Sequence, residues 1–313
     1  MAVTSLHLPV RSRAARRSRP PGYTSQMIFV ASGLIPVMVL FGIFAVAPVG
    51  IVLWLSLHKY NQLAPVAPYI GLRNFEYAFT NDALFINALT VTLKYALVAV
   101  PLNLLIALPI AMGLNQVTRL RAVFRAAFFL PTVASAVAVS LIWRYVYEPQ
   151  TGAVNAALAA LGLPQPSWLS DPSTALWAVL ITAVWQDLGY NILILLAGLQ
   201  TIPDDFYDAA KVDGAGAWPR FKDVTLPLLS RTLLFVSVLT MISYLQQFTY
   251  VQVMPSNPGG PINATTTLVL YIYTKAFSNM QLGYASAISV VLMAIILIIT
   301  LIQFRLLRSR WEY

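Results

Sequence analysis

The sequence predicts an all-α integral membrane protein with about six transmembrane helices, and three observations support this fold class. Hydrophobic residues make up 58% of the 313 residues, whereas charged residues make up only 10%. The mean hydropathy is +0.72. Soluble domains average roughly 25% charged residues, so lipid must solvate much of this surface. The third observation is a series of apolar runs, each long enough to cross a hydrocarbon core of about 30 Å as a helix.

The chain opens with a basic segment, residues 1–26, which we predict to be a disordered cytoplasmic tail. It contains five arginines and no acidic residue. A segment with so few large apolar residues and one sign of charge has too little apolar surface to form a core. The apolar run that follows, 27–57, is longer than the roughly 7–15 apolar residues of a cleaved signal peptide. We therefore expect it to be retained as the first span.

Five further apolar runs complete the predicted bundle, at 84–114, 122–147, 174–199, 232–254 and 283–304. Six spans put both termini on the same side of the membrane. Fifteen of the twenty Lys and Arg lie in the tail or in segments on its side, and the positive-inside rule places that side in the cytoplasm. This asymmetry also accounts for the net charge of +9, so the sequence gives no reason to expect a nucleic-acid partner.

Several kinds of chemistry have no support in the sequence. Cysteine is absent, and the two histidines, His7 and His58, are far apart in the chain. No metal site, thiol nucleophile or cofactor site is therefore expected. The phosphate-binding pattern Gly-x-x-x-x-Gly-Lys-Ser/Thr is also missing, so we do not expect the chain to bind ATP by that device or to act as an enzyme.

The segment between the fourth and fifth spans, 200–231, differs from the other connections. It holds five of the eleven acidic residues. Pro203 followed by two aspartates is typical of a helix start, and Gly214 can end that helix. A second start at Pro219 predicts two short cytoplasmic helices with a sharp bend. The residues alone fit either of two roles: docking into a groove of a partner protein, or lying at the membrane interface as an amphipathic helix.

The spacing within this segment resembles the permeases of ATP-binding-cassette (ABC) importers. Their cytoplasmic loop has the form E-A-A, three residues, Gly, nine residues, then I-x-L-P. This chain has Asp208-Ala209-Ala210, then Gly214, then Val224-Thr225-Leu226-Pro227, with every spacing kept. Asp replaces Glu and Val replaces Ile. The resemblance implies a type I ABC importer permease fold over 27–313, with a coupling loop that docks on an ATPase subunit through Phe206, Asp208, Ala209, Ala210, Asp213, Gly214, Leu226 and Pro227.

Further segments resemble the carbohydrate branch of that family: LAGLQTIP at 196–203, NPGGP at 257–261 and GYASA at 283–287. The resemblance implies import of a sugar, a polyol or a glycerol phosphate across a bacterial-type cytoplasmic membrane. It also implies a second permease, two ATP-binding subunits that hold ATP and Mg, and an extracytoplasmic solute-binding protein. The alternatives are an ion-coupled secondary transporter and an ABC importer for a non-sugar solute.

Polar side chains within the spans form the candidate substrate pathway. Asp187 and Asn191 are four residues apart and so share a helix face, and Lys94 is a second charge that we expect within a span. Such residues line a solute passage or bond neighbouring helices together, and Lys94 and Asp187 fit a mutual ion pair. The candidate pathway residues are Lys94, Trp185, Gln186, Asp187, Asn191, Ser243, Gln246, Gln247 and Tyr250.

Overall fold

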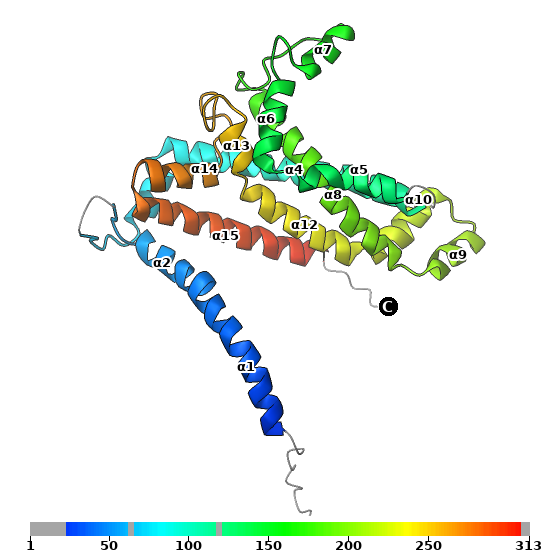
Figure 1. Cartoon of the computed structure of the whole chain (residues 1–313), viewed down its shortest axis with the longest axis horizontal. Helices are drawn as coiled ribbons and strands as arrows, with labels where there is room; N and C mark the ends of the chain where they lie inside the picture. The colour runs from blue at the N-terminus through cyan, green and yellow to red at the C-terminus, as the bar shows by residue number, and fades with distance from the viewer. Residues whose placement is uncertain (1–22, 62–65, 117–120, 308–313) are drawn as a thin grey trace, which may run out of the picture. The chain divides into compact units, whose positions relative to one another are not determined.

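The computed structural model describes residues 23–61, 66–116 and 121–307, and the predicted tail lies largely outside this part of the chain. Apart from one isolated bridge between His58 and Tyr69, every regular element of the described residues is a helix. The chain divides into two compact units, 1–51 and 52–313, called the N-terminal unit and the main unit below. Figure 1 labels their helices.

The first span contains α1 (Tyr23–Phe41), the π-helical turn η1 (Gly42–Val46) and α2 (Ala47–Ser56). Pro36 lies inside α1, and Pro48 follows η1 by two residues. A proline ring clashes with the carbonyl four residues earlier, here that of Phe44 within η1. The wider π turn gives this ring room without ending the helix.

Four long helical segments run side by side in the main unit (Figure 1). They are α4 (Ala83–Gln116), α8 (Ala175–Gln200), α12 (Ser230–Leu245) with α13 (Thr249–Val253), and α15 (Leu282–Leu307). The α4 and α8 helices share the apolar core, in which Tyr95, Leu180, Ile192 and Leu196 are fully buried. The predicted fifth span, 232–254, is not one continuous helix, because the helix is interrupted at Gln246–Phe248.

The predicted third span, 122–147, is not a straight helix. It consists of α5 (Arg121–Val133) and α6 (Ala136–Val146), which meet at an angle of 95°. Ser135 is extended, with ψ of 131°, so the helical hydrogen bonds stop at this point. Within the described residues, five helices are long and apolar enough to cross a membrane, or six if this bent pair counts as one span.

Shorter elements connect the spans. At the α14 end they are α3 (Arg73–Thr80), α14 (Leu268–Tyr273) and the π turn η3 (Thr274–Ser278), whereas α7 (Ala153–Ala160) follows α6. At the opposite end of the bundle lie α9 (Asp204–Val212), α10 (Ala217–Pro219), the π turn η2 (Arg220–Thr225) and α11 (Leu226–Leu228) (Figure 1).

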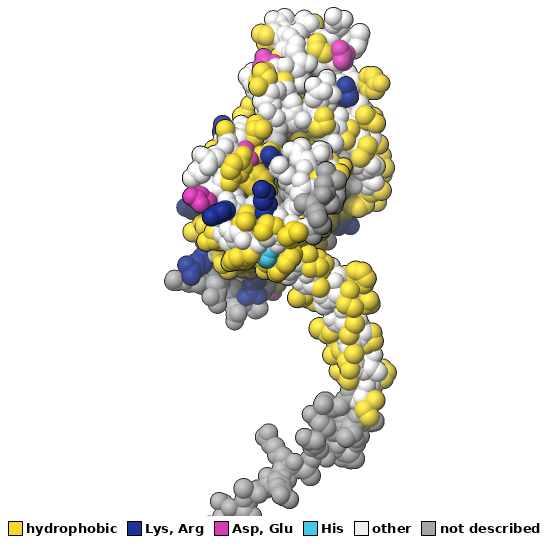
Figure 2. Space-filling view, turned by 90° about the vertical axis from the view of Figure 1, so that its left-hand side faces the viewer, with side chains coloured by type: hydrophobic (Ala, Val, Ile, Leu, Met, Phe, Trp, Pro, Cys, Tyr) yellow, Lys and Arg dark blue, Asp and Glu magenta, His cyan; other side chains and the backbone are white. Residues whose placement is uncertain are grey.

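Large apolar side chains cover much of the surface of the main unit. Leu105, Leu130, Ile142 and Leu301 are each more than 60% exposed. In Figure 2 hydrophobic side chains are widespread on the visible face, and charged ones are sparse. A monomeric protein in water rarely exposes so large an apolar surface. Lipid or neighbouring subunits would cover it in a membrane.

Candidate functional site

The loop between α8 and α12 forms the predicted helix with sharp ends. Pro203 is extended and precedes α9, whose first turn holds Asp204 and Asp205. At the other end Gly214 has φ of +76°. Its N–H donates to the Lys211 carbonyl at 3.0 Å, and the N–H of the next residue donates to the Ala210 carbonyl at 2.8 Å. This pair of bonds is a Schellman motif, which requires the left-handed conformation that glycine adopts without strain.

An apolar face of α9 is exposed to a large extent in the single chain. Phe206 is 41% exposed and Val212 is 88% exposed, and Ala209 lies exposed between them. On the second arm of the loop, Trp218 is 69% exposed. The predicted docking residues Asp213 and Leu226 are exposed as well, whereas Ala210 and Pro227 are half-buried.

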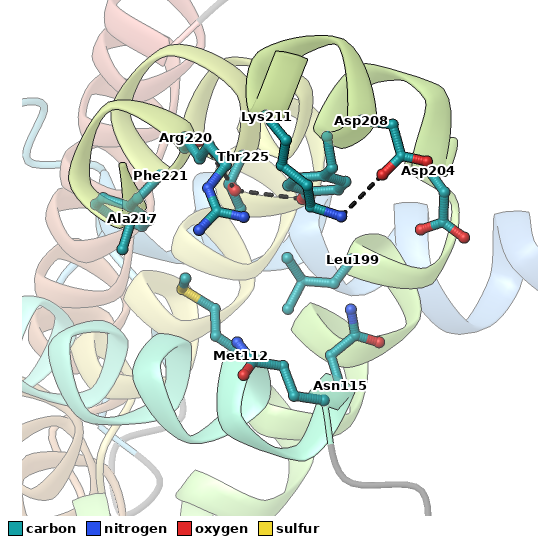
Figure 3. A pocket seen from close by; sticks show the side chains of 12 residues that line it. Met112, Asn115, Leu199, Asp204, Asp208, Lys211, Ala217, Arg220, Phe221 and Thr225 are labelled. Carbon is teal, nitrogen blue, oxygen red and sulfur yellow. Dashed lines mark hydrogen bonds and ion pairs between the residues drawn. The ribbon is translucent and has the colours of Figure 1, made fainter. Parts of the chain in front are cut away.

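The inner face of α9 borders a cavity of about 650 Å³, drawn in Figure 3. The end of α4, the end of α8 and the π turn η2 form the other walls. One side-chain contact connects the two arms of the loop across this space: Tyr207 Oη lies 3.2 Å from Thr225 Oγ1. Within α9 itself, Lys211 Nζ lies 2.8 Å from Asp208 Oδ1. No partner for Asp208 was predicted, and this exposed pair contributes little stability.

A second group of polar side chains lies among α4, α8 and α12. Asn191 donates through Nδ2 to Asn103 Oδ1 at 2.7 Å and to Thr240 Oγ1 at 3.1 Å. Asn103 in turn donates to the Tyr244 hydroxyl at 3.1 Å, and that hydroxyl interacts with the Asp187 carboxylate. Asn103 and Asn191 are at most 3% exposed, so this network bonds three helices together.

Three predicted pathway residues support irregular backbone. Gln186 Nε2 donates to the carbonyl of Ala134 at the bend between α5 and α6, at 2.8 Å, and Gln186 Oε1 accepts from the Tyr250 hydroxyl. Gln247 Oε1 accepts the Phe248 N–H at 2.9 Å where α12 is interrupted. Each is at most 9% exposed. Irregular backbone at membrane depth is tolerated when other groups satisfy it, as these side chains do.

The remaining predicted pathway residues lie at or near the surface, except that Asn191 is buried beside the second cavity. Asp187, Asn191 and Ser243 line a cavity of about 110 Å³ together with Thr132, Tyr190, Leu239 and Thr240. Trp185 is 40% exposed, and its ring lies 5.3 Å from that of Trp143. Gln246 and Lys94 are exposed. The expected ion pair between Lys94 and Asp187 is not formed, because the single ion pair among the described residues joins Lys211 and Asp208.

Sequence reasoning missed Tyr207, Tyr244 and Thr132. Tyr207 contacts a residue 18 positions away, and Tyr244 contacts one 141 positions away. Thr132 donates to the Gln186 carbonyl at 2.9 Å, between α5 and α8. Local patterns carry no signal for such contacts, because they depend on how two separate elements pack.

Comparisons with known proteins all point to the same protein family. Residues 12–312 match the family model described as "Binding-protein-dependent transport system inner membrane component". The probable ABC transporter permease protein YesP of Bacillus subtilis is 38% identical over 297 residues, which cover 94% of this chain and 93% of YesP. The trehalose/maltose transport system permease protein MalF of Thermococcus litoralis is 32% identical, covering 88% of this chain and 92% of MalF.

Two further similarities extend this result. The sn-glycerol-3-phosphate transport system permease protein UgpA of Yersinia pestis is 30% identical, covering 90% of this chain and 94% of UgpA. A chain from the crystal structure of a bacterial alginate ABC transporter, in complex with its pentasaccharide-bound periplasmic protein, superposes with a TM-score of 0.79. It is 22% identical and covers 92% of this chain and 98% of its own length, which shows a shared fold.

The family match settles several expectations. The chain is a multi-pass inner membrane protein that works with a binding protein, and ATP is bound by partner ATPase subunits rather than by this chain. An ion-coupled secondary transporter, one of the alternatives that the sequence left open, is therefore wrong. The chain belongs to the binding-protein-dependent transport system inner membrane components, and it is a permease subunit of an ABC importer that is similar to carbohydrate-type permeases.

Proposed function

We propose that this permease pairs with a second permease and two ATP-binding subunits to import a sugar, a polyol or a glycerol phosphate. An extracytoplasmic solute-binding protein delivers the solute. The carrying observation is the apolar face of α9, on which Phe206 is 41% exposed, Val212 is 88% exposed and Ala209 is exposed between them. Small and aromatic residues on one face of a short helix suit insertion into a groove of a partner.

The loop between α8 and α12 is connected closely enough to these two spans to transmit movement to them. Residues 201–203 alone separate α9 from α8, and α11 leads directly into α12. The Tyr207–Thr225 contact joins the two arms, so a displaced loop carries α8 and α12 with it. ATP-driven closure of the partner subunits would thereby tilt two helices that border the candidate pathway and switch its access.

The solute class rests on the relatives and on the pathway chemistry. The named relatives handle trehalose and maltose in one case and sn-glycerol-3-phosphate in another. Asp187 and Ser243, with Asn191 beside them at one cavity, offer hydrogen-bonding groups that suit hydroxyls, and Trp185 offers an aromatic ring for the apolar face of a sugar. We assign these four residues to the lining of the solute passage. We assign Gln186, Gln247 and Tyr250 to the support of the helices around it. Exposed Lys94 and Gln246 border it as contacts for lipid or for the second permease.

Orientation follows from the basic residues. Both termini and the α9 loop are assigned to the cytoplasm, and the α14 end of the bundle to the outer side, where the binding protein docks. Cysteine labelling with a membrane-impermeant reagent tests this assignment, because the chain has no native cysteine. Labelling of Val212→Cys from outside intact cells would contradict it.

The docking role is tested by co-purifying the chain with its ATPase. Gly214→Asp and Ala209→Glu should abolish ATP-dependent solute uptake and weaken ATPase association, while the chain still inserts in the membrane. Ala159→Glu changes an exposed alanine of α7 in the same way and serves as the matched control, with ATPase association unchanged. Normal uptake by both loop variants would refute the docking role.

A further inference from the structure

We infer that the passage lined by this chain selects uncharged, hydroxyl-rich solutes and disfavours anions, and that Asp187 sets this preference. The inference rests on the proposed function, because it takes the cavity at Asp187 as part of the solute passage. It narrows the proposed solutes to neutral sugars and polyols and excludes glycerol phosphates and acidic sugars.

The first support is the charge of the cavity lining. Asp187 is the only ionisable acid or base among the seven residues that line the cavity, apart from the phenol of Tyr190. No described Lys or Arg lies within ion-pair distance of its carboxylate. A site for phosphate or carboxylate needs a cation or several free N–H donors, and this chain presents a carboxylate instead.

The second support is the use of the nearby donors. Both N–H groups of the Asn191 amide are directed at Asn103 and Thr240, and the Thr240 hydroxyl lies 3.4 Å from Asn191 Oδ1. The Thr132 hydroxyl donates to the Gln186 carbonyl. These donors are therefore occupied within the protein, whereas the carboxylate of Asp187 keeps acceptor capacity beyond its bond from Tyr244. Solute hydroxyl groups can donate to that carboxylate, but a carboxylate or phosphate group of a solute cannot.

The third support is that the protein holds Asp187 in place. The Tyr244 hydroxyl interacts with its carboxylate. The Asn103 amide in turn donates to the Tyr244 hydroxyl at 3.1 Å. Because Asn103 also accepts from Asn191, the residues that orient the carboxylate are bonded to another residue of the cavity lining. Tyr244 and Asn103 are thus positioning residues for Asp187.

The test uses the complete transporter in proteoliposomes, with its binding protein, second permease and ATPase. Each neutral probe is compared with an anionic derivative of similar skeleton: glucose with glucuronate, and glycerol with glycerol 3-phosphate. We expect ATP-dependent uptake of the neutral member of a pair to exceed that of the anion by at least about tenfold, since like charges repel strongly where water is scarce. Asp187→Asn should lower this ratio several-fold with the same binding protein present, so the change belongs to the permease.

Glu148→Gln neutralises an exposed acid outside the cavity and is the control, with the ratio unchanged. Preferred uptake of anions by the wild type overturns the inference but leaves the importer function intact. An unchanged ratio in Asp187→Asn overturns the role of Asp187, and Tyr244→Phe provides a second variant if Asp187→Asn does not insert. Failure of the complete transporter to take up any sugar or polyol with ATP overturns the proposed function together with this inference.

Discussion

The amide of Asn191 donates to Asn103 Oδ1 at 2.7 Å and joins α8 to α4 at a fully buried point. This contact connects residues that are 88 positions apart, and it is the centre of the polar network that ends at Asp187. Asn103 uses its amide both as donor and as acceptor, so no other side chain of similar size can replace it completely.

Removal of Asn103 should destabilise the protein. Asn103→Leu leaves the Asn191 donor without its partner, and an unsatisfied buried polar group costs about 1–3 kcal/mol. We expect a lower thermal unfolding midpoint in detergent. Gln246→Leu, which changes an exposed amide of the same region, should leave the midpoint nearly unchanged. Equal midpoints for the two variants would contradict a structural role of the network.

The close approach of α8 and α5 depends on Gly189. A Cβ atom there would lie 2.1 Å from the Phe128 carbonyl oxygen, which belongs to backbone that cannot yield without moving α5. Gly189→Ala should therefore destabilise the protein by about 1–3 kcal/mol, as overpacking does. Gly113→Ala is the matched control in α4, where no atom lies within 4 Å, and it should be neutral or stabilising. A stable Gly189→Ala variant would show that the two helices can separate freely.

Tyr207 should matter for coupling rather than for docking, because its hydroxyl faces Thr225 and not the exposed face of α9. Tyr207→Phe removes this contact between the two arms and keeps the ring. We expect normal ATPase association and fewer solute molecules imported per ATP hydrolysed, measured together in proteoliposomes. Tyr145→Phe, at a side chain that is 79% exposed, is the control. Unchanged stoichiometry in Tyr207→Phe would mean that the Tyr207–Thr225 contact does not transmit movement.

The N-terminal end of α4 should lose stability in acid because of Asp82. Burial by itself raises the pKa of this carboxyl, but hydrogen bonds from Tyr271, Tyr284 and the Phe85 N–H, with the charge of Lys275, bring the pKa below its ordinary value of 3.8. The Tyr284 bond measures 2.7 Å. A carboxyl whose folded pKa is depressed stabilises the fold above its unfolded pKa, and this contribution disappears as the pH falls through the folded pKa.

Thermal unfolding of wild type and Asp82→Asn at several pH values checks this expectation. At neutral pH the variant should unfold at a lower temperature, and the difference should shrink below about pH 4, where the wild-type carboxyl gains its proton. Glu76→Gln changes an exposed acid of α3 and serves as the control. A difference between wild type and Asp82→Asn that persists unchanged in acid would show that the charge of Asp82 is not what stabilises this end.

The sequence by itself determined the fold class, the approximate positions of the apolar helices and the short helix α9, because these follow from local properties. Hydropathy over about twenty residues identifies a span, and Pro203, the two aspartates and Gly214 define both ends of α9. Only the tertiary structure decided the 95° bend at Ser135, the bonds of Gln186 and Asn103, and the separation of Lys94 from Asp187. Those features depend on how each helix is rotated and placed against its neighbours, and close packing of residues distant in sequence sets that rotation.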